Sequence, residues 1–160
     1  GVIRAKMNSL VDPDIIALLY EASQVGVQIE LIIRGMCSLI PGREGLSNNS
    51  KVISIVGQFL EHSRIFWFAN GDVPEAYIGS ADWMTRNLDR RVEAITPIEE
   101  PALRRKLERL LDLYMQDNRG AWDMHADGSF TQRMPGDDQP ECNSQLQLTS
   151  LWSRGLHPGQ

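Results

Sequence analysis

A strand–helix–strand pattern at the start of the sequence constrains the fold more than any other feature. An apolar run at residues 2–7 is followed by Asp12-Pro13. This pair is typical of a helix start, because Asp accepts backbone N–H groups and Pro fits the first helical position. Apolar residues then recur at helical spacing until Gly26, and a second apolar run follows at residues 27–33. The order predicts a βαβ unit, with parallel neighbouring strands and a right-handed crossover.

The composition suits one globular domain and excludes several other classes of protein. The 160 residues are 42% hydrophobic and 23% charged, and a net charge of −5 argues against a surface built for nucleic acid. The longest apolar runs are too short to cross a bilayer. Cys37 and Cys142 lack metal-ligand spacing, so we expect unpaired thiols in a reducing cytosol. The sequence lacks a signal peptide and begins within an apparent strand, so we expect it to be part of a longer protein.

Residues 59–93 carry the side chains of a predicted anion site. His62 and Arg64 stand two positions apart at the head of an apolar run, and strand residues at this spacing point to the same face. Gly79-Ser80 ends a second such run, and the turn between the runs predicts a hairpin that brings the strand ends together. The Ser80 hydroxyl would then bond to phosphate oxygens or to the imidazole of His62.

Arg34 is the third cationic candidate, because it directly follows the strand predicted at residues 27–33. Ligands bind outside the carboxyl ends of strands in such sheets, and a planar guanidinium suits bidentate recognition of phosphate. Gly35 would let a ligand approach the backbone closely. The alternative is that Arg34 caps the strand end with its stem packed and its head in water. We favour the binding role.

Glu93 lies in a third run, residues 91–96, which we predict to be a strand. If its carboxylate faces inward, it needs a partner and could orient His62 or pair with Arg34 or Arg64. If the strand lies at the edge of the sheet, Glu93 simply faces solvent. Periodicity leaves both possibilities open.

The rest of the chain is predicted from turn and helix signals. The remaining elements are a strand at residues 52–56, a hairpin turn at 70–74, a helix from Glu99 to about residue 118, a hairpin around Asp127-Gly128 and a helix at 144–152. Trp83 and Met84 are expected in a loop. Residues 133–143 are polar and contain Pro, so we expect a linker there, and we expect residues 153–160 to be frayed.

The motif formed by His62-x-Arg64 and Gly79-Ser80-x-Asp82 resembles half of the phospholipase D signature, which is His-x-Lys, then Asp, then Gly-Ser-x-Asn. Arg64 replaces Lys and Asp82 replaces Asn, and Ala69 stands where the middle Asp is expected. Longer strings are more specific. KMNSLVD, LIIRGMCSLIPG, ISIVGQFLEHSRIF and IGSADWMTRNLDRRVE strongly resemble the C-terminal domain of bacterial polyphosphate kinases, from about residue 3 to residue 121, with a weaker echo at 143–145.

The resemblance implies an α/β fold, a phospholipase-D-like mixed β-sheet flanked by helices. Residues 1–132 would be the C-terminal catalytic domain, and 133–160 a linker and short helix, partly disordered. The family's enzymes reversibly transfer the γ-phosphoryl group of ATP to polyphosphate through a phosphohistidine. That histidine belongs to a preceding, related domain, and the two domains face each other across a tunnel. This chain would supply half of that tunnel and would be inactive when isolated.

The resemblance also assigns roles to individual residues and partners. Arg34 matches the family's phosphate-binding arginine, and His62 matches its second active-site histidine. Together with the residues argued above, this predicts His62 and Arg34 as catalytic residues, Arg34, His62, Arg64 and Ser80 as substrate-binding residues, and Asp82 and Glu93 as supporting residues. Mg²⁺ would accompany ATP, with its ligands mainly outside this chain and no metal ligand assigned within it. The expected partners are ATP or ADP, inorganic polyphosphate, the preceding domain and further copies in a homo-oligomer. The expected location is the cytoplasm, or the periphery of the inner membrane.

Two other functional classes remain open. A phosphodiesterase of the phospholipase D type needs two half-sites, and the chain has one, so a homodimer would have to supply the second. A noncatalytic module that binds phosphate is the other class. Turnover of a generic phosphodiester would favour the first, and binding of ATP or polyphosphate without turnover would favour the second.

Overall fold

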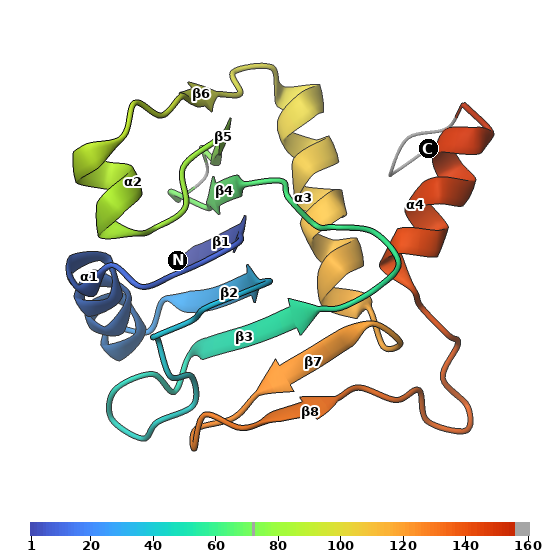
Figure 1. Ribbon diagram of the computed structural model, residues 1–160, viewed down its shortest axis with the longest axis horizontal. Coiled ribbons are helices and arrows are strands. Elements are labelled where there is room, and N and C mark those ends of the chain that lie inside the picture. The colour runs from blue at the N-terminus through green and yellow to red at the C-terminus, as the bar shows by residue number, and fades with distance from the viewer. Residues whose placement is uncertain (72, 156–160) are drawn as a thin grey trace.

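In the computed structural model, residues 1–71 and 73–155 are described, and they form one eight-stranded mixed sheet with four helices (Figure 1). The sheet order is β6-β5-β4-β1-β2-β3-β7-β8. The strands are β1 Val2–Met7, β2 Gln28–Ile33, β3 Ser50–Ile55, β4 Ile65–Phe68, β5 Glu75–Gly79, β6 Ile95–Pro97, β7 Ala121–Met124 and β8 Phe130–Gln132. The helices are α1 Pro13–Gln24, α2 Thr85–Arg90, α3 Pro101–Gln116 and α4 Ser144–Ser153.

The βαβ unit predicted from the sequence is confirmed. β1 and β2 are parallel neighbours, and β3 extends the parallel part of the sheet. Asp12 is the N-cap of α1, and its carboxylate accepts the Ile15 N–H at 3.1 Å. The remaining strand pairs are antiparallel, so the sheet is mixed as expected.

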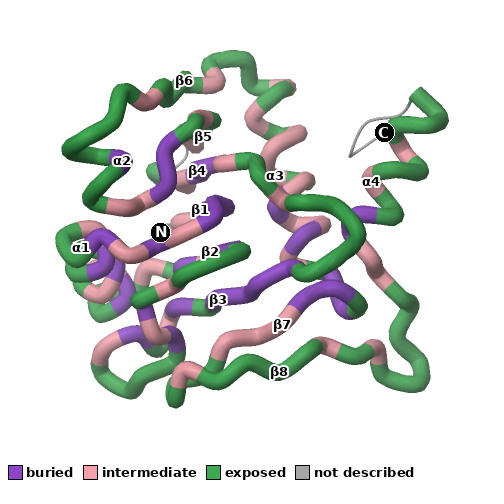
Figure 2. Tube along the Cα trace, viewed as in Figure 1, coloured by how far each residue is buried: buried purple, intermediate pink, exposed green. Residues whose placement is uncertain are grey.

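Two hydrophobic layers cover the two faces of the sheet, and the central strands are its most buried part (Figure 2). Figure 1 shows α1 and α3 on opposite sides of the sheet. Ile16 and Leu19 of α1 belong to one layer, whereas Leu111 and Tyr114 of α3 belong to the other. Alternate strand residues therefore pack against different helices, as the two-residue period of a strand requires.

Several strands begin or end side by side at one end of the sheet, the end where β1 and β2 finish. β1 and β2 are parallel and both end there, at Met7 and Ile33. β4 runs antiparallel to β1 and begins opposite Lys6, and β5 returns to end at Gly79 beside it. The residues after β1, after β2, before β4 and after β5 are thus neighbours in space. The predicted site lies at these strand ends.

The two predicted hairpins are both present. Asn70 and Gly71 connect β4 to β5 with φ values of 41° and 66°. Both residues adopt left-handed backbone, which Asn and Gly tolerate better than other residues, and this is why Asn-Gly is a strong turn signal. Asp72, which was part of the predicted turn, lies outside the described residues. The second hairpin joins β7 and β8, and Gly128 has a φ of 84°.

Three local predictions are corrected by the structure. The segment after Trp83, expected to be a loop, forms the short helix α2. The third strand of the meander begins at Ile95, because Gly79 pairs with Ile95, so Glu93 precedes the strand rather than lying in it. His62 and Arg64 also precede their strand. The pairing between β1 and β4 stops at Lys6 and Ile65, and the N–H of Asn8, just after β1, donates to the Asp82 carboxylate at 2.7 Å.

The C-terminal part of the described chain is anchored to the body of the domain. The predicted helix is present as α4, and Ser144 at its start is fully buried. The Asp117 carboxylate at the end of α3 accepts hydrogen bonds from the N–H and hydroxyl of Ser144, at 2.8 and 2.6 Å. The predicted fraying falls largely on residues 156–160, which lie outside the described residues. Cys37 and Cys142 are both free, as expected.

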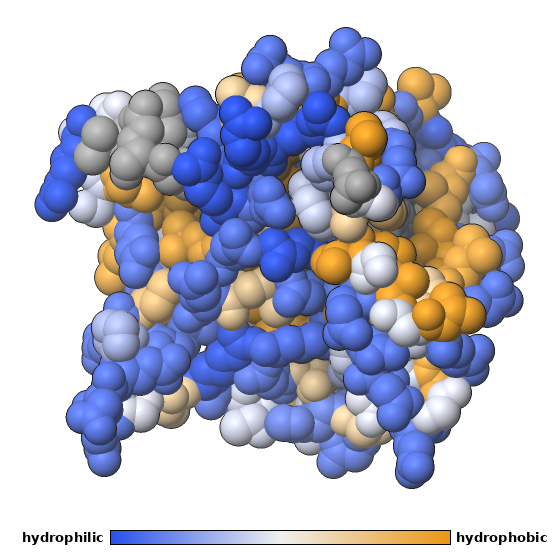
Figure 3. Space-filling view, turned by 180° about the vertical axis from the view of Figure 1, so that it is seen from behind, coloured by the Kyte–Doolittle hydropathy of each residue, from blue (hydrophilic) through white to orange (hydrophobic). Residues whose placement is uncertain are grey.

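Beyond its first turn, α4 leaves an apolar groove against α3. Leu148 reaches the core layer of α3, whereas Trp152 is 59% exposed. The groove has a volume of about 480 Å³, and hydrophobic side chains gather on this side of the molecule, at the left of Figure 3. None of the helices in residues 1–71 and 73–155 has the length and apolar character needed to cross a membrane.

Candidate active site

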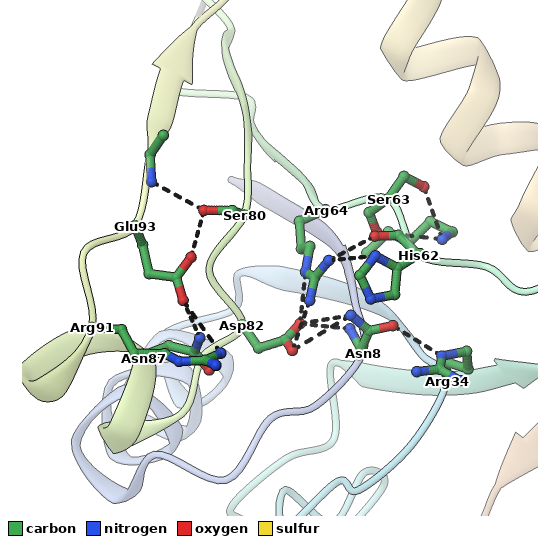
Figure 4. Close-up of polar contacts among 12 residues, drawn as sticks. Asn8, Arg34, His62, Ser63, Arg64, Ser80, Asp82, Asn87, Arg91 and Glu93 are labelled. Atoms are coloured by element: carbon green, nitrogen blue, oxygen red, sulfur yellow. Dashed lines mark hydrogen bonds and ion pairs between the residues drawn. The ribbon is translucent and has the colours of Figure 1, made fainter.

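A continuous hydrogen-bonded chain links the strand ends at the site (Figure 4). Arg34, after β2, donates through Nε to Asn8 Oδ1 at 2.9 Å. Asn8, after β1, donates its backbone N–H and its amide to the carboxylate of Asp82. Asp82 in turn receives Arg64 in a fork, with Nε to Oδ1 and Nη2 to Oδ2 both at 3.2 Å. Residues from four parts of the chain are fixed relative to one another.

Asp82 is the centre of this hydrogen-bonded network. Its charge matters because it stands at the Asn position of the phospholipase D signature and pairs with Arg64, which stands at the Lys position. Asp82 and Arg64 are both largely buried, with side-chain exposures of 9% and 12%. A planar guanidinium and a carboxylate match each other in two parallel hydrogen bonds, which a lysine and an asparagine cannot form. The two replacements in the signature, Arg for Lys and Asp for Asn, therefore compensate each other.

His62 is oriented by the same guanidinium. Arg64 Nη1 lies 2.9 Å from His62 Nδ1 and donates to the His62 carbonyl at 2.9 Å. Since arginine has donors and no acceptor, Nδ1 accepts, and the neutral ring carries its proton on Nε2. The sequence prediction that His62 and Arg64 converge is correct, although both lie in the loop before β4. Most of the Arg64 donors are engaged within the protein.

A buried lysine, which was not among the predicted site residues, contacts the residues on either side of His62. Lys6 on β1 is 1% exposed, and its Nζ lies 3.1 Å from Glu61 Oε2 and 3.0 Å from Ser63 Oγ. It also stands over the Tyr114 ring, 5.0 Å from the centroid. Burial lowers the pKa of the Lys6 amine, while Glu61 opposes that shift. A charged residue inside the apolar run of β1 was the available signal for this contact.

Arg34 differs from Arg64 and Lys6 because it is exposed and its hydrogen-bond partner, Asn8, is neutral. Within residues 1–71 and 73–155, its side chain is held by the Asn8 amide and no carboxylate pairs with it. Arg64 and Lys6, by contrast, face Asp82 and Glu61. The guanidinium of Arg34 is fixed in position and retains its uncompensated charge, so it can receive an anion.

Ser80 and Glu93 form a separate cluster, so of the alternatives open for these residues the structure rules against hydrogen bonds to His62, while contact of Ser80 with phosphate stays a prediction. The Ser80 hydroxyl donates to Glu93 and accepts the Ala94 N–H at 3.0 Å. The other carboxylate oxygen of Glu93 accepts from Asn87 on α2. Hydrogen bonds from Ser80 and then Asn87 lower the pKa of the Glu93 carboxyl. Asp82, not Glu93, pairs with the site arginine.

Ser80 nevertheless lines the same surface groove as Arg64. The groove has a volume of about 490 Å³ and extends from Ser63 and Arg64 to Gly79 and Ser80. Its wall contains apolar residues of β5 and α3, so it joins the polar strand ends to the apolar face of α3. Of the predicted site residues, the structure brings together Arg34, His62, Arg64 and Asp82, and it places Ser80 farther along this groove.

A family model described as polyphosphate kinase C-terminal domain 2 matches residues 1–145. The chain belongs to the polyphosphate kinase family. It is 72% identical over 156 residues to the polyphosphate kinase of Parasynechococcus marenigrum, covering 98% of this chain and 22% of that relative. The chain thus spans about a fifth of the length of the curated relatives that it matches.

Solved structures support the fold of this polyphosphate kinase domain. The crystal structure of polyphosphate kinase from Porphyromonas gingivalis matches with a TM-score of 0.91 and 37% identity, covering 97% of this chain and 24% of that chain. Nuc from Salmonella typhimurium, a phospholipase D family member, matches with a TM-score of 0.60 and 17% identity, covering 78% of this chain and 82% of that one. The second likeness shows the fold alone. The predicted phospholipase-D-like α/β fold is confirmed.

The Asp82 pairing in this polyphosphate kinase domain makes a stability prediction. Asp82→Asn removes the charge opposite Arg64 and replaces one acceptor with a donor, so we expect the free energy of unfolding to fall by about 2 kcal/mol. Urea unfolding of the 160-residue chain measures this change. Asp89→Asn, at an exposed position on α2, is the matched control and should stay within about 0.5 kcal/mol of wild type. Equal midpoints for the two variants would contradict the pairing argument.

Proposed function

We propose that this chain is one wall of the active site of an ATP:polyphosphate phosphotransferase. In this reaction the γ-phosphoryl group of ATP moves reversibly onto polyphosphate. The single observation that carries the proposal is Arg34, which in the described part of the chain is a fixed and uncompensated guanidinium at the end of a parallel strand. Membership of the polyphosphate kinase family supports a phosphate group of ATP or polyphosphate as the anion.

The chemistry of phosphoryl transfer suits these residues. The enzyme mainly positions the reactants and stabilises charge on the oxygens around the transferred phosphorus. Arg34 would hold non-bridging oxygens with two parallel hydrogen bonds. His62 would donate from Nε2 to a departing or bridging oxygen, since its Nδ1 is occupied by Arg64. Asp82 would keep Arg64 in place, so we assign Arg64 a positioning role in addition to any contact with substrate.

The remaining parts of the reaction lie outside this chain in the proposal. A preceding, related domain would carry the phosphorylated histidine and form the opposite wall, and the full-length protein would act as a homo-oligomer. Mg²⁺ would arrive with the nucleotide and neutralise phosphate charge. Asp82 and Glu61, the carboxylates nearest to His62, are paired with Arg64 and Lys6. Because these carboxylates are already paired, they do not suit a metal ion. No group of three or more His, Cys, Asp or Glu residues in the described ranges could hold a metal ion.

The test uses the full-length enzyme that contains this domain. With ATP labelled in the γ-phosphoryl group, we expect label in acid-insoluble polyphosphate, and with ADP and polyphosphate we expect ATP. The 160-residue chain should do neither. Hydrolysis of bis(p-nitrophenyl) phosphate by the isolated chain, without polyphosphate synthesis by the full-length protein, would instead indicate a phosphodiesterase. Binding of polyphosphate with no turnover by either form would indicate a noncatalytic module.

A further inference from the structure

The loop that carries His62 is bound by a side chain from the far end of the sequence. Gln145, in the first turn of α4, accepts the Phe59 N–H at 2.9 Å through Oε1. Its Nε2 donates to the Phe59 carbonyl at 2.8 Å and to Glu61 Oε1 at 3.0 Å. One amide therefore satisfies both backbone groups of Phe59 and the residue before His62. Figure 1 shows the loop between β3 and β4 reaching the base of α4.

Glu61 is held from two sides. Gln145 binds its Oε1, and Lys6 of β1 binds its Oε2 at 3.1 Å. The peptide that leads into His62 is thus tied both to the central strand and to α4. Because Arg64 fixes the ring from the other side, the position of His62 depends on both attachments.

Gln145 itself is rigidly placed. It is 5% exposed, and its neighbour Ser144 is held by the buried carboxylate of Asp117. Asn143 caps the helix by accepting the Leu146 N–H at 3.0 Å. The start of α4 is therefore fixed even though Trp152 farther along is exposed. A hydrogen-bonding group supported in this way can set the geometry of a loop.

Gly57, in the loop after β3, lies directly against the Gln145 side chain. A Cβ built on Gly57 would lie within 2.8 Å of the Gln145 side-chain carbon Cδ, closer than real Cβ contacts allow. The backbone at Gly57 has no left-handed φ, so the effect of a larger residue comes from its contact with the Gln145 amide rather than from backbone strain. Any side chain at this position would push Gln145 away from Phe59.

From these contacts we propose that Gln145 is a positioning residue of the phosphoryl-transfer site, which it serves by fixing residues 57–61 and thereby the His62 imidazole. The inference rests on the proposed function of His62. It assigns a role to the beginning of α4, where the only signal in the sequence was the weak resemblance at residues 143–145. The family model extends to residue 145 and so includes this glutamine.

The first experiment compares Gln145→Ala with Gln147→Ala in the full-length enzyme. Gln147 lies on the same helix with an exposed side chain, and its contact is a 3.5 Å approach to the Cys142 sulfur. For Gln145→Ala we expect kcat to fall about 10- to 100-fold, as for other residues that orient a reacting group. KM for ATP should change by less than about threefold, because Arg34, the proposed phosphate ligand, keeps its contact with Asn8. Gln147→Ala should match wild type in both constants.

Gln145→Glu gives a signature in the pH profile that simple loss of packing would not give. The introduced carboxylate has the same shape but faces the Phe59 carbonyl and the Glu61 carboxylate with an oxygen. The carboxylate that it faces is Glu61, which Lys6 of β1 and Tyr114 of α3 contact from the other side, with His62 and Arg64 following in the loop. Two adjacent carboxylates raise the pKa of the pair. We expect the ratio of variant to wild-type kcat to rise as the pH falls from about 8 to about 6, because a protonated carboxyl can donate as the amide does.

Gly57→Ala completes a double-mutant cycle with Gln145→Ala. Gly57→Ala should lower kcat about 10-fold in the wild-type background and have little further effect when Gln145 is already alanine. Gly136→Ala, where an added Cβ meets nothing within 4 Å, is the control for a glycine substitution. Additive losses would contradict the contact between the two positions. This cycle also keeps the inference testable if Gln145→Ala folds poorly.

Hydrogen exchange separates this inference from the proposed function. In the full-length Gln145→Ala variant, the Phe59 amide should lose protection while the amides of β1 and β2 keep theirs. Wild-type kcat for Gln145→Ala, with an inactive His62→Ala enzyme, would overturn the inference and leave the proposed function intact. If the wild-type enzyme makes no polyphosphate, the proposed function fails, and unchanged protection of Phe59 would then also reject the positioning role of Gln145.

Discussion

Polyphosphate synthesis by the full-length enzyme is expected to fall about 1,000-fold when His62 or Arg34 is replaced by alanine. Removing one preorganised donor from a site of developing charge costs about 100- to 1,000-fold, and loss of acid–base function costs a similar factor. Arg34→Ala removes the uncompensated cation at the end of β2, and His62→Ala removes the donor that Arg64 orients. Steady-state incorporation of labelled γ-phosphate measures both.

Two controls make this prediction specific. His125→Ala alters an exposed histidine between β7 and β8, and Arg105→Ala alters an exposed arginine of α3, so both variants should retain wild-type rates. Arg34→Lys keeps the charge but loses the planar fork and the contact with Asn8, so we expect it to be intermediate. Since a catalyst does not change the equilibrium, the ADP-driven reverse reaction must be impaired too. Wild-type rates for both alanine variants would reject the site.

Asp117→Ala is expected to cost the largest share of stability, about 4 kcal/mol of unfolding free energy. Asp117 is 1% exposed, and one of its oxygens accepts the backbone N–H groups of Arg119, Gly120 and Ala121. The other accepts both donors of Ser144. Alanine would leave these buried groups without their charged acceptor and would release the start of α4. Urea unfolding of the chain at pH 7 measures the loss, with the exposed Asp138→Ala as the control.

The Asp117 contribution also has a defined pH dependence. Burial would raise the pKa of the Asp117 carboxyl, but hydrogen bonds from Ser144, Arg119 and Gly120 outweigh burial and lower the pKa below its ordinary value of 3.8. The stabilisation is therefore fully present above the unfolded-state pKa and is lost as the pH falls through the lower, folded-state pKa. The stability difference between wild type and Asp117→Ala should be constant near neutral pH and shrink below about pH 4. A difference that widens on acidification would contradict the hydrogen bonds.

Local signals in the sequence predicted much of the fold. The Asp12-Pro13 start of α1, the Asn70-Gly71 turn and the apolar runs of β1 and β2 each act within a few residues. Their outcome depends on backbone preferences that are similar in any context. The position of Arg34 followed from the same reasoning, because the end of a parallel strand is fixed by the strand itself.

The contacts that organise the site could not be predicted in this way. Asn8 meets Asp82 across 74 positions, and Gln145 meets Phe59 across 86. Glu93 was misplaced because its run alternates like a strand, whereas its carboxylate is taken up by Ser80 and Asn87. Helix α2 was missed because it has six residues and no side-chain cap at Met84. In each case a tertiary contact decided between local alternatives of similar energy.

The two outermost strands have a consequence for how this domain behaves at high concentration. β6 and β8 contain three residues each, and Pro97 in β6 has no N–H to offer. Sheets that end in long, regular strands can recruit a strand from another molecule and grow into aggregates. In this eight-stranded sheet the outermost strands are too short to offer another molecule many unpaired N–H and C=O groups. The short outer strands therefore give the domain little tendency toward edge-to-edge self-association.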